Sequence, residues 1–286
     1  MNAVRVLALV RIVMSSLFLW MVLAGNWVNY KNESFSVFDS SGGSGFGVVV
    51  TILGVLMVII SLLMLSEHEI KLGKLAVGGG QILLILSVAA FTTILSFLII
   101  VHSGAFRDLS DVRGAGWGAA GACLTAYMFP QVVIMGIAFL GEATSTSLKD
   151  QDKQIFSFVT LVSGIVVVIS PLFKWFGNET EVWSGYEPGA PRMGFLLLLL
   201  GVGMALVGAM RLRSKGLAEP GGRLSHPHLQ IVAGMAIVSP VLGWIITNSQ
   251  REDFSIGFGP WLALVAGITM TGSAAFELTR REVTAG

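Results

Sequence analysis

Eight long apolar runs divide this chain of 286 residues, and they constrain its fold more than any other feature. Each run is about 20 residues long, which is the length that an α-helix needs to cross the hydrocarbon core of a bilayer. In lipid every backbone polar group must be hydrogen-bonded within the protein, so only helices and closed β-barrels can span it. The alternating ten-residue segments of a barrel do not occur, and we therefore expect helices. Their expected positions are 6–25, 46–65, 75–101, 117–140, 155–174, 194–210, 229–247 and 260–277.

Charge is scarce outside these runs as well as within them. Charged residues make up 12% of the chain and hydrophobic residues 54%, whereas soluble domains carry about 25% charged residues. Such a chain cannot cover a water-facing surface, which excludes a soluble enzyme and a disordered tail protein. Eight spans also leave no length for a separate soluble domain. We predict an all-α polytopic membrane protein with about eight transmembrane helices, which has the lipid bilayer as its surroundings.

The net charge and the cysteine content exclude several kinds of partner and cofactor. A formal net charge of +1 gives no reason to expect a nucleic-acid partner. The single cysteine, Cys123, cannot form an intramolecular disulfide and cannot build a Cys-based zinc or iron–sulfur site. We accordingly expect no cofactor and no metal.

The distribution of lysine and arginine predicts the orientation of the chain. The N-terminus, the loops after the second, fourth and sixth runs, and the C-terminus together hold 12 of the 18 basic residues. Cytoplasmic loops of membrane proteins carry an excess of Lys and Arg. Both termini are therefore predicted to be cytoplasmic, in a multi-pass protein of the cell membrane.

A short motif that runs from serine to tryptophan recurs along the chain. It reads SSLFLW at Ser15–Trp20, SPLFKW at Ser170–Trp175 and SPVLGW at Ser239–Trp244, with a weak fourth copy at Ser96–Val101. A pair of glycines precedes the next apolar run in several of these units. Repetition of this kind is typical of chains built from duplicated units. It predicts four tandem helical hairpins in two four-helix halves, 1–145 and 146–286.

All seven tryptophans fall on or beside the side predicted to be external. Tryptophan anchors membrane interfaces and is enriched in protein–protein contacts. The set is therefore a candidate partner face, and the alternative is an anchor belt whose members also pack external loops onto helix ends. The same loops hold two N-x-S/T sequons, at Asn32 and Asn178, which are candidate glycosylation sites. The tryptophans are Trp20, Trp27, Trp117, Trp175, Trp183, Trp244 and Trp261.

Ionisable side chains are missing from the middle of every run. Arg11 and Glu277 lie toward the predicted cytoplasmic ends, where long side chains can reach the headgroups. This placement weighs against a proton pump or another ion-coupled machine. The best candidate for an intramembrane polar pocket is Tyr127 with Pro130 and Gln131, because a proline within a helix frees a backbone carbonyl. The alternative there is a structural kink whose polar groups are satisfied.

Two histidine-containing segments lie in predicted cytoplasmic loops. They are His226-Pro227-His228 and Glu67-His68-Glu69, and each has too few ligands for a metal site. No constellation of catalytic residues emerges, so we expect a protein that is not an enzyme. Acidic residues in the external loops would be the candidates if it were one.

Two functions compete on these observations. The first is a non-catalytic scaffold or accessory subunit whose aromatic-rich external face contacts a protein partner or a second copy of the chain. The second is a transporter or permease for a small, weakly charged or apolar solute, which would pass through the cleft between the two halves near Tyr127 and Gln131.

Overall fold

The computed structural model describes residues 3–30, 33–39, 44–65, 78–102, 112–140, 146–147, 150–178, 181–187, 193–213, 224–249, 255–280 and 282–283. Eight α-helices lie within these ranges, and all eight are long and apolar enough to cross a membrane. The expectation of eight apolar helices is confirmed, with ends displaced by a few residues. The helices are α1 (Ala3–Ala24), α2 (Ser44–Leu65), α3 (Gly79–His102), α4 (Trp117–Leu140), α5 (Asp150–Ile169), α6 (Gly194–Arg213), α7 (His226–Asn248) and α8 (Phe258–Arg280).

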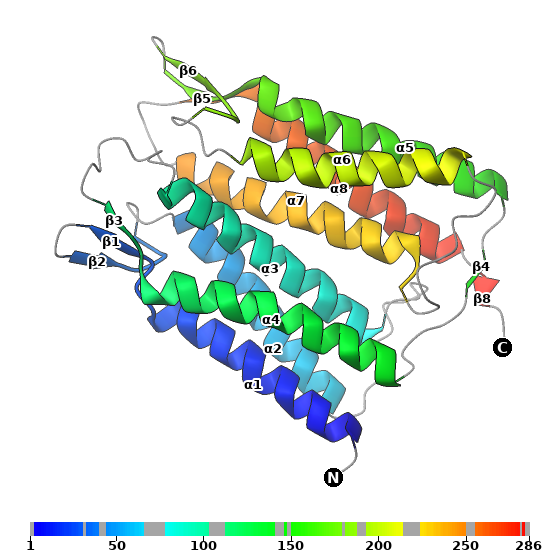
Figure 1. Cartoon of the computed structure of the whole chain (residues 1–286), viewed down its shortest axis with the longest axis horizontal. Coiled ribbons are helices and arrows are strands. Elements are labelled where there is room, and N and C mark those ends of the chain that lie inside the picture. Colours follow the sequence, from blue (N-terminus) through cyan, green and yellow to red (C-terminus); the bar gives the residue numbers. More distant parts are fainter. Residues whose placement is uncertain are drawn as a thin grey trace.

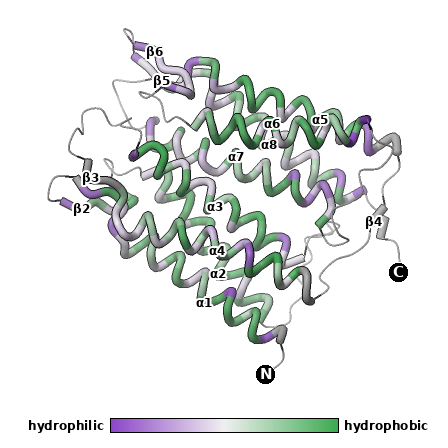
Figure 2. Tube along the Cα trace, in the orientation of Figure 1, coloured by the Kyte–Doolittle hydropathy of each residue, from purple (hydrophilic) through white to green (hydrophobic). Residues whose placement is uncertain are grey.

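The helices form one bundle with two distinct ends (Figure 1). Both chain termini lie at one end, which we call the terminal end. Two small sheets lie at the other end, which we call the sheet end. Figure 2 shows that the helices are hydrophobic along most of their lengths, while hydrophilic residues gather at the strands and helix ends. This distribution is what a bundle surrounded by lipid requires.

The two sheets at the sheet end have the same internal order, and the apolar runs did not predict them. The first has β1 (Val28–Tyr30) in the middle, between β2 (Glu33–Phe35) and β3 (Val112–Ala115). The second has β5 (Lys174–Gly177) in the middle, between β6 (Val182–Ser184) and β7 (Ser255–Ile256). All of these pairings are antiparallel. In each sheet a β-hairpin is therefore joined by a strand that comes much later in the chain.

At the terminal end, the segment before α5 pairs with the segment after α8. The strand β4 (Thr146–Ser147) is antiparallel to β8 (Glu282–Val283). A single-turn 3₁₀ helix, Ser170–Leu172, continues α5 at the sheet end. These short elements bring distant parts of the chain together at both ends of the bundle.

The core of the bundle is centred on α3 and α7, which are its two most buried helices. Helices α1 to α4 form a closed ring, in which each helix packs on its two neighbours. Helix α7 packs on α3, α2 and α8, while α5 packs on α6 and α8. The two inner helices therefore carry the contacts between the first four helices and the last four.

Small residues allow the helices to approach closely. On α4, Ala122 and Ala126 are fully buried, and Gly118 lies against the backbone of Gly25. On α6, Gly201 faces Gly164 of α5. Lipid supplies no hydrophobic drive for association, so such approach and the van der Waals contact that it permits hold membrane helices together.

We expect Gly164→Ala to destabilise the protein by about 1–3 kcal/mol, the cost of overpacking a well-packed site. A Cβ at Gly164 would lie 2.6 Å from the backbone nitrogen of Ala205 and 2.8 Å from the carbonyl oxygen of Gly201. The matched control is Gly203→Ala on α6, where a Cβ meets nothing within 4 Å. That change should be neutral or stabilising by up to about 1 kcal/mol. Thermal unfolding in detergent measures both, and equal melting temperatures would contradict the prediction.

Candidate functional site

The seven tryptophans all belong to elements at or next to the sheet end, but they do not form one outward face. Trp27 and Trp175 are fully buried, and Trp244 is 4% exposed. These three side chains cannot contact a partner, so the predicted seven-residue partner face is wrong in this respect. Their indole rings are large apolar groups, and folding places them between the strands and the ends of the inner helices.

Trp27, which directly precedes β1, and Trp175, which lies in β5, make matching contacts. The carbonyl of Trp27 accepts a hydrogen bond from the N–H of Gly116 at 2.9 Å, and the carbonyl of Trp175 accepts one from Gly257 at 3.0 Å. Each indole also packs on an aromatic ring of an inner helix. The ring centroid of Trp27 is 5.0 Å from that of Phe97 on α3. Trp175 is 5.3 Å from Trp244 on α7.

This correspondence differs from the one that the sequence motif predicts. The motif aligns Trp175 with Trp20, but Trp20 is 54% exposed on α1. In the structure Trp27 takes the place that corresponds to Trp175. The motif therefore pairs Trp175 with a tryptophan that lies within α1, seven residues before the structurally equivalent Trp27. Its serine, aliphatic and aromatic residues are compatible with either a helix interior or a helix end.

The remaining tryptophans are partly or largely exposed. Trp20 and Trp117 lie on adjacent helices with ring centroids 5.5 Å apart, and both are about half exposed, as is Trp261. Trp183 is half-buried and stacks on Phe176 of the neighbouring strand. Exposed indoles near the ends of helices are placed as interface anchors.

The predicted intramembrane pocket also needs correction. The side chain of Tyr127 is 55% exposed, and that of Gln131 is exposed as well. Pro130 lies within α4, as predicted. These side chains occupy the outer surface of α4 rather than the interior of the bundle, and Tyr127 packs there on Phe91 of α3. Helical periodicity decides this, because α4 turns its Ala122, Ala126 and Phe129 face inward.

Of the two sequons, only the asparagine at Asn178 lies within the described residues. Asn178 directly follows β5, at the turn into β6. Its backbone N–H donates to the carbonyl of Glu181 at 2.9 Å, and its Oδ1 accepts from the Glu181 N–H at 2.7 Å. Asn32 lies outside the described residues, between the ends of β1 and β2.

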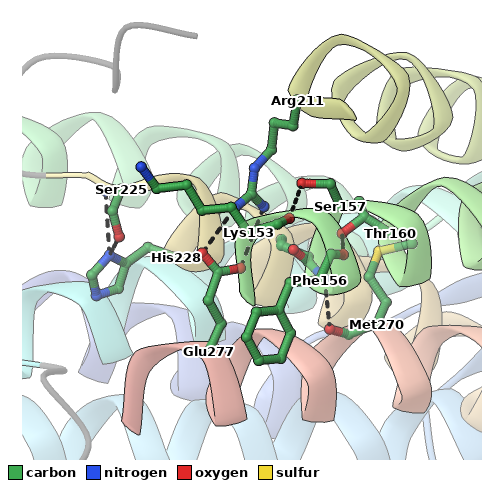
Figure 3. A network of polar contacts seen from close by, with 10 residues as sticks. Lys153, Phe156, Ser157, Thr160, Arg211, Ser225, His228, Met270 and Glu277 are labelled. Carbon is green, nitrogen blue, oxygen red and sulfur yellow. Dashed lines mark hydrogen bonds and ion pairs between the residues drawn. The ribbon is translucent and has the colours of Figure 1, made fainter. Parts of the chain in front are cut away.

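The most strongly polar group of buried residues lies at the terminal end, between α5, α6, α7 and α8 (Figure 3). Arg211 of α6 and Glu277 of α8 form an ion pair there. Arg211 Nη2 donates to Glu277 Oε1 at 2.8 Å, and Nη1 donates to Oε2 at 3.3 Å. The Glu277 side chain is 0% exposed and that of Arg211 is 7% exposed. Two parallel hydrogen bonds make this the planar, bidentate arrangement that favours arginine over lysine.

Glu277 therefore does not extend toward the headgroups as expected from its position near a helix end. Arg11 does not do so either, because its side chain is 1% exposed. It lies between Gly136 of α4 and Met64 of α2, whose sulfur is 3.5 Å from Nη1. Both long side chains turn inward because they sit on the buried faces of their helices. Ionisable groups placed in this way inside a membrane bundle are uncommon and often functional.

The histidines that were expected in a loop begin α7 instead. His226 and His228 are both buried. The Nδ1 of His228 accepts from the backbone N–H of Ser225 at 3.3 Å and lies 2.7 Å from Ser225 Oγ. A backbone N–H can only donate, so Nδ1 carries no proton in this arrangement and the pair caps the helix. The segment His226-Pro227-His228 is thus a helix start, and the described residues contain no group of three metal-binding side chains. Glu67-His68-Glu69 lies outside the described residues.

A buried amide lies on α7, one turn further into the membrane. Gln230 is 1% exposed, and its Nε2 donates to the carbonyl of Met270 on α8 at 3.2 Å. The contact with a carbonyl assigns Nε2 to that side, which leaves Oε1 pointing elsewhere. The buried atoms Gln230 Oε1 and Ser273 Oγ have no hydrogen-bond partner. Gln230 Oε1 can only accept a hydrogen bond, whereas the Ser273 hydroxyl can accept or donate one.

No protein-family model, curated protein or solved structure matches this chain. The function must therefore be argued from the two regions described above, the sheet end and the buried polar group at the terminal end.

Proposed function

We propose that this multi-pass membrane protein is a non-catalytic scaffold or accessory subunit that presents its sheet end to a protein partner. The observation that carries the proposal is that a buried tryptophan side chain packs each of the two sheets against the ends of the inner helices. A fully buried tryptophan directly precedes the middle strand of the first sheet, at Trp27, and another lies in the middle strand of the second, at Trp175. Surfaces that are held rigid before binding lose less entropy on association than mobile loops do.

The exposed side chains of the sheet end indicate which kind of partner surface would be complementary to it. Its exposed apolar side chains include Phe38 and Val182, which are 43% and 58% exposed. The same two segments also carry exposed acids, at Glu33, Asp39, Glu181 and Glu187. Protein interfaces ordinarily combine exposed apolar side chains with charged ones. The complementary partner presents an apolar surface with basic residues around it.

We further propose that the terminal end faces the cytoplasm. The exposed charges at that end include Arg5, Arg213 and Arg280, in contrast to the acids of the sheet end. Basic residues on the cytoplasmic side agree with the positive-inside tendency and with attraction to anionic lipids there. Glycosylation of the sequon at Asn178 would report the same orientation.

We also propose that the chain consists of two duplicated four-helix units, each of two hairpins. The common strand order of the two sheets supports this. So do the equivalent hydrogen bonds from Gly116 to Trp27 and from Gly257 to Trp175. A duplicated scaffold presents two similar sheets on one face, which suits a partner that contacts both.

Site-specific photocrosslinking in native membranes tests the partner proposal. A benzophenone amino acid at Phe38 or Val182 is expected to yield one protein adduct of constant mass from both positions. The matched control is Leu199 on α6, which is apolar and 73% exposed but lies within a helix that faces lipid. It should give lipid adducts alone. The absence of a protein adduct at both sheet-end positions, or equal protein adducts at Leu199, would contradict the proposal.

A further inference from the structure

The two sets of four helices close differently. In the first four helices, the second helix α2 packs along the third helix α3, and it also packs along α7. In the last four, the second helix α6 packs on α5 but only sparsely on the third helix α7. The first four helices therefore form a closed ring, and the last four form a ring that is weakly joined on one side. This asymmetry lies between α6 and α7, which run side by side in Figure 1.

A single stripe of residues attaches α6 to α5. Its buried residues recur at spacings of three and four, and most of its other side chains face outward. Such a stripe covers one face of a helix and leaves the rest free. The attachment is narrow along the length of α6. The buried residues are Gly194, Leu197, Gly201, Met204 and Gly208.

Arg211 stands at the next position of that stripe, in the last turn of α6. It reaches Glu277 of α8 through two hydrogen bonds, at 2.8 Å and 3.3 Å. Along their described lengths, α6 and α8 otherwise hardly pack on one another. The ion pair is thus a specific tie between α6 and the inner part of the bundle, and it lies at the end of the weak α6–α7 side.

Two polar side chains of the last four helices have buried atoms that lack a hydrogen-bond partner. Gln230 Oε1 on α7 and Ser273 Oγ on α8 are buried without a hydrogen-bond partner. Ser273 precedes Glu277 by one helical turn, so both belong to neighbouring turns of α8. An unsatisfied buried acceptor costs free energy, and a solute with a hydrogen-bond donor would remove that cost.

We propose that α6 is a lateral gate and that the Arg211–Glu277 pair is its latch. When the pair separates, α6 moves away from α7 and opens the interior of the last four helices to the bilayer. A lipid-soluble molecule that carries a hydroxyl group then reaches Gln230 and Ser273. This goes beyond the proposed function, which requires no movement of α6.

Electron-paramagnetic distance measurements test the gate. The single cysteine allows a Cys123→Ser background, with spin labels at Leu206 of α6 and Leu229 of α7, which are both exposed. Glu277→Gln is expected to shift the distance distribution to longer values by several ångströms. The exchanged pair Arg211→Glu with Glu277→Arg should return it to the wild-type value. Labels at Leu9 of α1 and Leu62 of α2 are the matched control and should report no change.

A milder variant keeps the test decisive. Glu277→Asp retains the charge and shortens the side chain by one methylene, so a partial shift toward the longer distance is expected if Glu277→Gln fails to fold. Wild-type distances in every folded variant would overturn the gate.

A photoreactive long-chain alcohol tests access to the interior. Its labelling of the peptides that contain Gln230 and Ser273 should rise several-fold in Glu277→Gln, and Gln230→Met in that variant should lower it to the wild-type level. Equal labelling with and without the latch would overturn this part of the proposal. Crosslinking at Phe38 and Val182 is independent of both results, so failure of the gate and failure of the scaffold proposal can be told apart.

Discussion

Replacement of Glu277 by alanine is expected to lower the free energy of unfolding by about 3–5 kcal/mol, because it leaves the Arg211 guanidinium charged and buried. The carboxylate is 0% exposed and accepts both hydrogen bonds from Arg211. The loss should appear as a fall in melting temperature on the order of 10 °C, given the scaling for chains of this size.

The removal of both charges is expected to have a much smaller effect. Arg211→Met with Glu277→Leu takes away the interaction and also its desolvation cost. The double variant should therefore be as stable as the wild type or up to about 4 kcal/mol more stable. Cys123 offers a direct readout, since this half-buried thiol reacts with a thiol-specific fluorophore as the helices separate. Glu187→Ala, at an exposed acid of the sheet end, is the matched control. If Glu277→Ala melted together with Glu187→Ala, the pair would contribute no net stability.

The second large effect is expected at the tryptophans that fasten the sheets. Trp27→Ala and Trp175→Ala should each cost about 3–5 kcal/mol, the usual penalty for emptying a large aromatic site in a packed core. Both indoles are fully buried, and Trp175 Nε1 also donates to the carbonyl of Ser170 at 3.0 Å. Trp175→Phe should lose less, because the ring packing is retained and one hydrogen bond of about 0.5–1.5 kcal/mol is removed.

Trp261→Ala is the matched control for these changes, since Trp261 lies at the same end of the bundle and is 46% exposed. A surface substitution of this kind should change stability by no more than about 0.5 kcal/mol. Melting temperatures in detergent rank the four variants. Limited proteolysis of the strands adds a local readout, because cleavage should increase in the sheet that has lost its tryptophan. Equal losses at Trp27 and Trp261 would show that burial is not what matters.

The helices could be predicted from the sequence because lipid imposes a simple rule. An apolar run of about 20 residues has to hydrogen-bond its own backbone, and a helix is the local way to do so. The strands could not be predicted in the same way. They are two to four residues long, which is too short for an alternating pattern, and β1 pairs with β3 from a distant part of the chain.

For the candidate site residues too, the sequence predicted the position along the helix axis but not which side chains are buried. The position of each tryptophan along the chain placed it near one end of the bundle, but which of them are buried depends on how the strands fold over the inner helices. Tyr127 and Gln131 appeared as a pocket because the residues are polar, and the inward face of α4 turned out to be the opposite one. The buried stripe of α6 continues at Arg211, and this spacing was the available signal for the pairing of Arg211 with Glu277.

The sequence by itself determined eight helices that are long and apolar enough to span a membrane, because hydropathy and length act locally along the chain. The tertiary structure decided which faces of those helices turn inward. It buried Trp27 and Trp175 under two sheets, and it paired Arg211 with Glu277 across 66 residues of sequence. Such contacts depend on the rotation of one helix relative to another. That rotation is set by close packing at glycines and by the balance between desolvation and ion pairing, and neither quantity belongs to a single segment.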